Sequence, residues 1–162
     1  MVYAGAIAVV ATLVYLAVQL RQNTSALRSA SYEHWNTVAS TYAEFIANNA
    51  EELGEIEELS SFDELSPRQL SVFMGLINIA VSQAETAFLL HRAGNLDEDV
   101  FEARIYSFLR YISVLRFGWI GWDILKDGHI EAFTASVESK RADFQKQFKQ
   151  AGLKSYSLEK AP

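Results

Sequence analysis

The stretch that decides the fold is Val2–Val18, VYAGAIAVVATLVYLAV, which carries no charged residue and no proline. Continued through Gln19 and Leu20 it is nineteen residues long, or roughly 28 Å of helix at about 1.5 Å per residue. This length approximates the ~30 Å hydrocarbon core of a bilayer. Apolar residues occupy every face of such a helix, which argues against a buried core helix with one apolar stripe. The sequence therefore predicts a transmembrane helix over residues 1–20.

A cleaved secretory signal peptide is the alternative interpretation of this stretch. No basic residue precedes the apolar run, the run is longer than a usual signal core, and no Ala-x-Ala site precedes Arg21. We therefore favour a retained anchor. Because Arg21 and Arg28 follow the span, the positive-inside tendency places the C-terminal bulk in the cytoplasm. The predicted location is the inner (cytoplasmic) membrane, crossed once, with the C-terminal domain cytoplasmic.

Small residues recur every four positions within the predicted span, at Ala4, Ala8 and Thr12. Positions four apart share one face of a helix, and a ridge of small side chains lets another helix approach closely. We expect this face to contact an integral membrane protein partner or a second copy of the chain in a homo-oligomer. The simpler alternative is that alanine is common in bacterial spans.

The segment after the span continues as a helix. Residues 22–47 contain no Gly and no Pro, and their apolar residues recur at three–four spacing. Asn48-Asn49 predicts an interruption, after which a short acidic helix follows. Residues 51–64 hold seven acids and no base, which is typical of a solvated face and loop.

The later helices are marked by local start and stop signals. Ser66-Pro67-Arg68-Gln69 has the pattern of a capping box with proline at the first helical position, and Gly94-Asn95 is a typical helix end. The next helix is expected to stop near Gly118. A short helix reaching Lys126 and a last helix over about residues 129–151 complete the expected set.

No segment alternates apolar and polar residues as a half-buried strand does. We therefore predict an all-α fold, in which one N-terminal transmembrane helix (1–20) continues into an antiparallel bundle of four or five helices (21–152), followed by a loose tail (153–162). The two later apolar helices are not expected to span a membrane. The first carries Asn78, Gln83 and Glu85, and the second carries three arginines.

Composition and motifs exclude several classes of function. The 162-residue chain has no cysteine, which excludes disulfide scaffolds, Cys-ligated metal centres and thiol catalysis. The net charge of −6 argues against nucleic acid as a partner. Neither the Glu-x-x-His and His-Glu-x-x-His metal motifs nor the common nucleotide and hydrolase fingerprints occur. We accordingly predict no catalytic, cofactor-binding or metal-binding residue.

Glu85 is the most interesting acid, because apolar residues flank it on both sides. A buried glutamate has a raised pKa and can carry protons. Its position on the polar strip of its helix instead favours solvent exposure.

Three aromatic residues and two glycines fall within six positions, residues 117–122 (FGWIGW). Trp and Arg are enriched at protein interfaces and at membrane surfaces, so Arg116, Phe117, Trp119 and Trp122 are candidate contacts with a partner or with the surface of the lipid bilayer. A packed corner of the bundle explains the same residues equally well. The sequence leaves both interpretations open.

Three segments resemble a group of small bacterial proteins of unknown function: residues 15–24 (YLAVQLRQNT), residues 94–101 (GNLDEDVF) and the tryptophan-containing segment. The proteins of that group have one N-terminal span and a helical domain. The resemblance implies the same architecture over most of this chain. It implies no activity, cofactor or catalytic residue.

These observations lead to three hypotheses of function. The first is a non-enzymatic, membrane-anchored accessory or scaffold subunit of a larger membrane protein complex, which docks through its span and through its cytoplasmic bundle. The second is a single-span sensor whose bundle binds a small ligand between helices. The third is an enzyme with Glu85 as general base. We predict the first and keep the sensor as the alternative.

Overall fold

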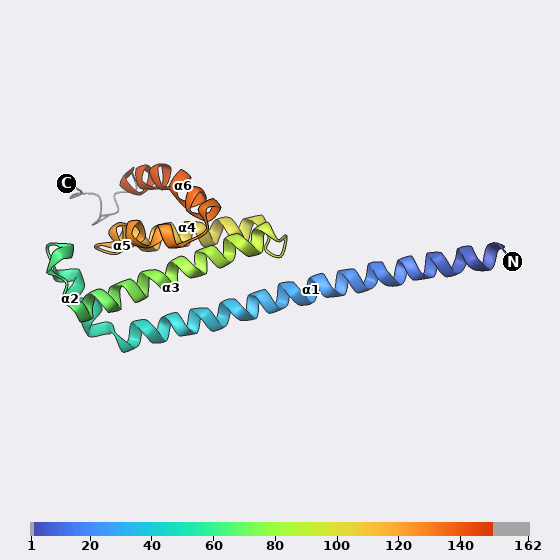
Figure 1. Ribbon diagram of the computed structural model, residues 1–162, viewed down its shortest axis with the longest axis horizontal. Helices are drawn as coiled ribbons and strands as arrows, with labels where there is room; N and C mark the ends of the chain where they lie inside the picture. The colour runs from blue at the N-terminus through green and yellow to red at the C-terminus, as the bar shows by residue number, and fades with distance from the viewer. Residues whose placement is uncertain (1, 151–162) are drawn as a thin grey trace.

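The computed structural model describes residues 2–150, which form six α-helices and two 3₁₀ turns (Figure 1). The structure does not describe residue 1, residues 151–162, or the side chains of residues 2–8, 27, 28, 31, 32, 34–36 and 148–150. The described residues contain no strand, so the predicted all-α class is confirmed. The tail predicted at 153–162 falls outside the described residues.

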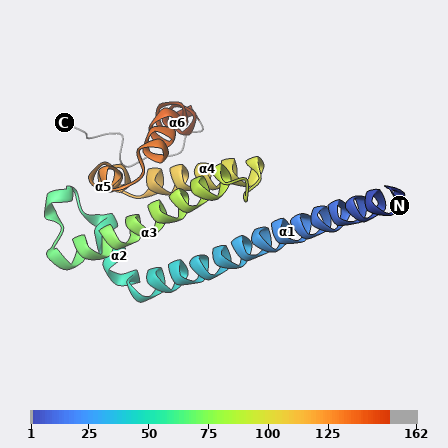
Figure 2. The same ribbon diagram turned by 45° about the vertical axis from the view of Figure 1, so that its right-hand side comes forward.

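α1 (Val2–Asn48) is one continuous helix of 47 residues, about 70 Å long at ~1.5 Å per residue. No glycine lies between Gly5 and Gly54, and no proline precedes Pro67, so nothing in this segment favours a break. The N-terminal half of α1 projects beyond the other helices, and its second half runs alongside them (Figures 1 and 2). The predicted continuation of the first helix past residue 20 is confirmed.

α1 ends where the sequence predicts, at Asn48-Asn49. The side-chain amide of Asn49 donates to the carbonyl of Phe45 (2.8 Å), which satisfies a carbonyl near the end of α1. α2 (Ala50–Glu58) and the 3₁₀ turn η1 (Phe62–Glu64) then form the end of the bundle farthest from the N-terminus of α1 (Figure 1).

α3 (Pro67–Arg92) is the central helix, in contact with α1, α2, α4 and α5. Among the described residues it is the one helix that is long and apolar enough to cross a membrane, with a mean hydropathy of 1.4 over its most apolar window, so this criterion selects α3 and not the predicted span at residues 1–20. The apolar side chains of α3 form the core of the bundle. The buried residues of α3 are Phe73, Leu76, Ile77, Val81, Ala84, Ala87 and Phe88.

Both ends of α3 match their sequence signals. Ser66 Oγ accepts from the backbone N–H of Gln69 (3.3 Å), and Gln69 Oε1 accepts from that of Ser66 (3.0 Å), so the predicted capping box is confirmed. At the other end Gly94 has φ of +72°. The N–H of Asn95 donates to the carbonyl of Leu90 (2.9 Å), as in a Schellman motif.

α4 (Glu98–Val114) follows α3 after this turn, and α5 (Gly118–Leu125), the 3₁₀ turn η2 (Lys126–Gly128) and α6 (Glu131–Gln150) complete the bundle. α4 ends earlier than the predicted stop near Gly118. Gly118 instead begins α5, which is the predicted short helix reaching Lys126, so most of the aromatic segment 117–122 belongs to that helix.

Aromatic packing joins α4, α5 and α6. The Trp122 ring is fully buried and meets Phe108 and Phe133 edge to face, with ring centroids 5.7 Å and 5.9 Å away. Edge-to-face pairs of this kind add to the free energy gained from burial alone. The core thus extends from α3 to the last helix.

Two glycines give a test of the corner between α4 and α5. A Cβ at Gly118 would lie 2.0 Å from the carbonyl oxygen of Ile112, whereas at Gly54 it would meet nothing in the described part of the chain within 4 Å. We expect Gly118→Ala to lower the free energy of unfolding by about 2–3 kcal/mol, because backbone must move. Gly54→Ala, at an exposed helical position, should raise it by about 0.5–1 kcal/mol. Denaturant unfolding followed by tryptophan fluorescence measures both, and equal effects would contradict the tight corner.

Candidate functional site

The aromatic segment of α5 faces inward. Phe117, Trp119 and Trp122 are 6%, 3% and 0% exposed. The indole N–H of Trp119 donates to Ser113 Oγ (3.2 Å) and that of Trp122 to Glu138 Oε1 (2.6 Å), so both polar groups are satisfied inside the bundle. These three residues therefore present no surface to a partner or to a membrane. The packed corner is the interpretation that their burial supports.

Arg116, the fourth candidate contact, also binds within the protein. Its guanidinium donates to the carbonyl of Glu57 (2.8 Å). Because this carbonyl belongs to the last turn of α2, the arginine ties the end of α2 to the corner between α4 and α5. The outward residues of α5 are instead Ile120 and Ile124, which are 39% and 54% exposed.

The structure describes only part of the small-residue face of the predicted span. The side chains of Ala4 and Ala8 lie outside the described residues, and Thr12 is exposed. The larger apolar side chains around Thr12 are exposed as well, and they project beyond the bundle (Figure 1).

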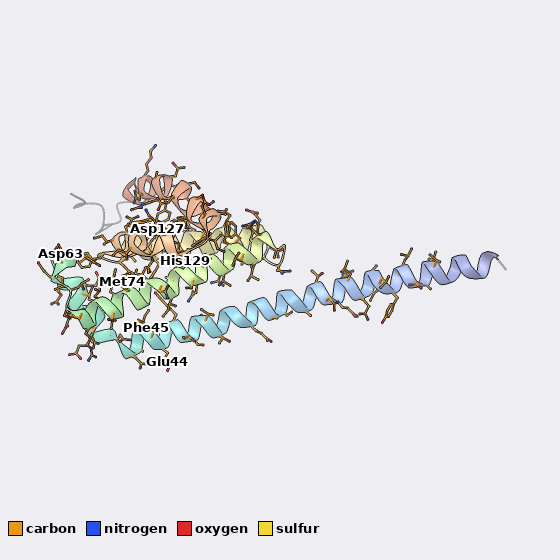
Figure 3. All side chains as sticks on the ribbon, viewed as in Figure 1. Glu44, Phe45, Asp63, Met74, Asp127 and His129 are labelled. Carbon is orange, nitrogen blue, oxygen red and sulfur yellow. The ribbon has the colours of Figure 1, made fainter. Side chains whose placement is uncertain are left out.

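Glu85 pairs with His129, which precedes α6. Glu85 Oε2 lies 2.9 Å from His129 Nδ1, and Glu85 Oε1 accepts from the backbone N–H of Ile130 (2.8 Å). The side chains of Glu85 and His129 are 18% and 12% exposed, so the expected solvent exposure of Glu85 is wrong. Figure 3 shows His129 beside α3, the helix that carries Glu85.

The electrostatic setting of Glu85 does not suit a proton carrier. Burial raises the pKa of its carboxyl, but the hydrogen bonds from Ile130 and His129 outweigh burial, and the pKa lies below its ordinary value of 4.5. Glu85 is therefore a carboxylate that accepts hydrogen bonds at the start of α6. The helix dipole favours negative charge at that position.

A cavity of about 230 Å³ lies between α1, α3 and α4. A second cavity of about 300 Å³, between α1 and α3, adjoins it through Gln83. Sequence reasoning missed both, since their walls come from helices far apart in the chain. We name the first the three-helix cavity; its walls are formed by Tyr42, Ala80, Gln83, Ala84, Arg104, Ser107, Phe108 and Tyr111.

Gln83 Nε2 is a buried polar atom in the wall of the three-helix cavity with no hydrogen-bond partner in the described residues, and Tyr42 Oη, which is also buried there, has the hydroxyl of Tyr111 beside it. A buried donor left unpaired costs about 1–3 kcal/mol. Such groups in native proteins usually bind water or a ligand. The three-helix cavity is therefore the candidate functional site.

Tyr42 and Tyr111 form one side of this cavity, with ring centroids 5.5 Å apart and nearly perpendicular rings. Burial raises the pKa of Tyr42. Burial, and next the neighbouring Tyr42, raises the pKa of Tyr111 well above its ordinary value of 10.0. Both phenols are therefore neutral at physiological pH and can donate their protons to an acceptor.

Metal chemistry has no support in the described residues, where no group of three or more His, Asp or Glu could hold a metal ion. His91 has a packing role. Its ring stacks on Phe101 with centroids 4.4 Å apart, and its Nε2 lies 3.2 Å from Glu98 Oε2, so it joins the end of α3 to α4. The side chain of His34 lies outside the described residues.

Comparison with known proteins yields no match. No protein-family model, no curated protein and no solved structure matches this chain. The resemblance to small bacterial single-span proteins therefore stays a prediction.

The Glu85 pair gives a pH-dependent test. We expect Glu85→Gln to lower the free energy of unfolding by about 1–2 kcal/mol at neutral pH, because a charged acceptor becomes neutral. The lowered pKa means that this contribution is present above pH 4.5 and is lost as the pH falls through the folded-state value. The difference between wild type and variant should therefore shrink on acidification.

Denaturant titrations at neutral and at acidic pH measure this difference. Glu131→Gln is the matched control, since Glu131 is an exposed acid in the first turn of α6, the helix whose start Glu85 contacts; it should change the free energy of unfolding by less than about 0.5 kcal/mol. A Glu85→Gln effect that is independent of pH would contradict the assignment.

Proposed function

We propose that the protein is a non-enzymatic, membrane-anchored accessory or scaffold subunit of a larger membrane protein complex. The observation that carries this proposal is the projecting half of α1. Its large apolar residues between Val9 and Leu20 are 49% to 71% exposed. Apolar surface this extensive is rare on a soluble monomer and typically marks a site of contact with a membrane or a protein.

The contrast between α1 and α3 supports the choice of α1 as the anchor. α3 has the hydropathy of a span, but 44% of its most apolar window is buried inside the bundle. The apolar side chains of the projecting half of α1 contact water unless lipid or protein covers them. Residues 2–20 are also long enough, at about 28 Å, to match a bilayer core.

The packing of α1 on α3 supports a bundle that stands close to the bilayer. Phe45 is level with Gly75, because a Cβ at Gly75 would lie 3.1 Å from the Phe45 ring. The two helices are antiparallel (Figure 1), so Arg92 at the end of α3 is level with residue 28 of α1. That level is about 12 Å beyond Leu20 at ~1.5 Å per residue, just outside the headgroup layer.

The side of the membrane in this proposal follows from the residues next to the span. Arg21 follows the span directly, which the positive-inside tendency favours on the cytoplasmic side. The acidic residues of α2 and η1 lie at the end of the bundle away from the projecting half of α1 (Figure 2), and Glu98 and Asp99 lie at the nearer end. We therefore propose, from Arg21, that the bundle lies on the cytoplasmic side of the inner membrane.

The partner in this proposal is an integral membrane protein or a second copy of the chain. It would pack on the Ala4, Ala8 and Thr12 face within the bilayer, where small side chains allow close approach. Outside the bilayer, Ile120 and Ile124 replace the buried tryptophans as the candidate contacts of α5.

The first test is membrane insertion. We expect Val10→Arg combined with Leu13→Arg to release the full-length protein from membranes, because each central arginine costs about 2.5–3.5 kcal/mol of insertion free energy. Sedimentation with membranes after alkaline extraction measures this. Ile124→Arg, which places the same charge at an equally exposed apolar position of the bundle, should stay in the membrane fraction. Wild-type protein that disperses without detergent would overturn the anchor.

The second test is lateral association. We expect Ala4→Leu combined with Ala8→Leu to disrupt the complex, because larger side chains prevent close helix packing. Native mass spectrometry after extraction in mild detergent measures the bound partner. Ala6→Leu with Ala17→Leu, on the opposite face of the helix by periodicity, is the control expected to retain it. Wild-type protein recovered only as a monomer would contradict the subunit proposal while leaving the anchor intact.

A further inference from the structure

We propose that the three-helix cavity binds a small, uncharged and mostly apolar molecule that carries one carbonyl oxygen. This goes beyond the accessory-subunit proposal and does not depend on it, since the walls of the cavity come from α1, α3 and α4 outside the predicted span.

The cavity is larger than a structural water needs. At roughly 30 Å³ of liquid volume per water molecule, its volume of about 230 Å³ corresponds to about seven waters. An apolar cavity of ~150 Å³ is already sufficient for benzene. The three-helix cavity therefore has room for a single ring with a substituent, and the adjoining cavity of about 300 Å³ has room for a longer tail.

The polar groups of the cavity walls can donate hydrogen bonds, so a matching ligand carries a hydrogen-bond acceptor. Ala80, Ala84 and Phe108 supply apolar surface. The amide Nε2 of Gln83 is a donor without a partner in the described residues, and the hydroxyl of Tyr42, which accepts from that of Tyr111, keeps its own proton for an acceptor. Apolar walls with a few convergent polar groups are typical of small-molecule sites. One carbonyl oxygen has two lone pairs and can accept from both groups.

The charge of the walls favours a neutral ligand. The buried polar groups of the walls are an amide and a phenol, and burial keeps that phenol protonated. A buried carboxylate would lose its hydration without a buried cation to replace it. Arg104, the charged residue of the cavity wall, belongs to the exposed part of α4.

An occupant of this cavity would also connect the anchor helix to the bundle. Tyr42 belongs to α1, Gln83 to α3 and Phe108 to α4. Binding between them would hold the second half of α1 more tightly against α3 and α4, and the folded state would be stabilised in proportion to occupancy.

The experiment uses the full-length protein in lipid nanodiscs, with thermal unfolding followed by tryptophan fluorescence. The probes are acetophenone, ethylbenzene and benzoate, which share a ring and differ in the acceptor and the charge. We expect acetophenone to raise Tm in a saturable way, and ethylbenzene and benzoate to require about tenfold higher concentration for the same shift. No saturable shift with any probe would mean a cavity filled by water only and would overturn the proposal. Tighter binding of benzoate would overturn the neutral class.

Two variants of matched shape separate binding from folding. Tyr42→Phe and Gln83→Met each remove one donor from the cavity wall, so we expect each to weaken acetophenone binding about tenfold. The Tm of free Gln83→Met should stay the same or rise by about 2–4 °C, because an unsatisfied buried group is lost. The controls are Tyr106→Phe and Gln147→Met, at exposed positions outside the cavity. They should leave acetophenone binding unchanged.

A purely structural role for Tyr42 and Gln83 predicts the opposite pattern. Their variants would then unfold at lower temperature, and acetophenone would shift wild type and variants equally through the lipid. A third variant, Ala80→Leu, fills the cavity from its wall and should abolish the acetophenone shift. Retention of that shift in Ala80→Leu would place the bound probe elsewhere and overturn the site.

Discussion

The contact between Phe45 and Gly75 is the constraint on which the arrangement of the molecule depends. Figure 3 shows Phe45 on the side of α1 that faces α3, and a Cβ at position 75 would lie 3.1 Å from the Phe45 ring. Glycine therefore allows the ring to lie on the backbone of α3. This close approach fixes the line along which α1 leaves the bundle, and it places Tyr42, one turn earlier, in the wall of the three-helix cavity.

The sequence correctly predicted the helix starts and ends that depend on residues close together in the chain. The Ser66–Gln69 capping box, the end of α3 at Gly94 and the interruption at Asn49 each involve hydrogen bonds across a few residues, and those residue types have strong local preferences. The candidate site depends on tertiary pairing instead. Glu85 meets a histidine 44 residues away. No local preference specifies that pairing, which explains why its exposure was predicted wrongly.

Apolar segments of similar composition have different environments in this fold. The tryptophans of α5 and the apolar face of α3 are enclosed, while the apolar residues of the projecting half of α1 are exposed. The hydropathy of a segment indicates how strongly its side chains tend to leave water, but it does not indicate which surface then covers them. For α3 and α5 the neighbouring helices supply that surface. For the projecting half of α1 no described residue supplies it, which is the physical basis of the proposed anchor.

The unbroken backbone of α1 makes it a stiff connection between the proposed span and the bundle. Tyr42 lies 22 positions after Leu20, about 33 Å along the axis at ~1.5 Å per residue. Because no glycine or proline interrupts the helix between them, a rotation of the proposed span would be carried along α1 to Tyr42. Such a rotation would withdraw the phenol from the wall of the three-helix cavity, so that movement of the span and occupancy of the cavity would be mechanically coupled.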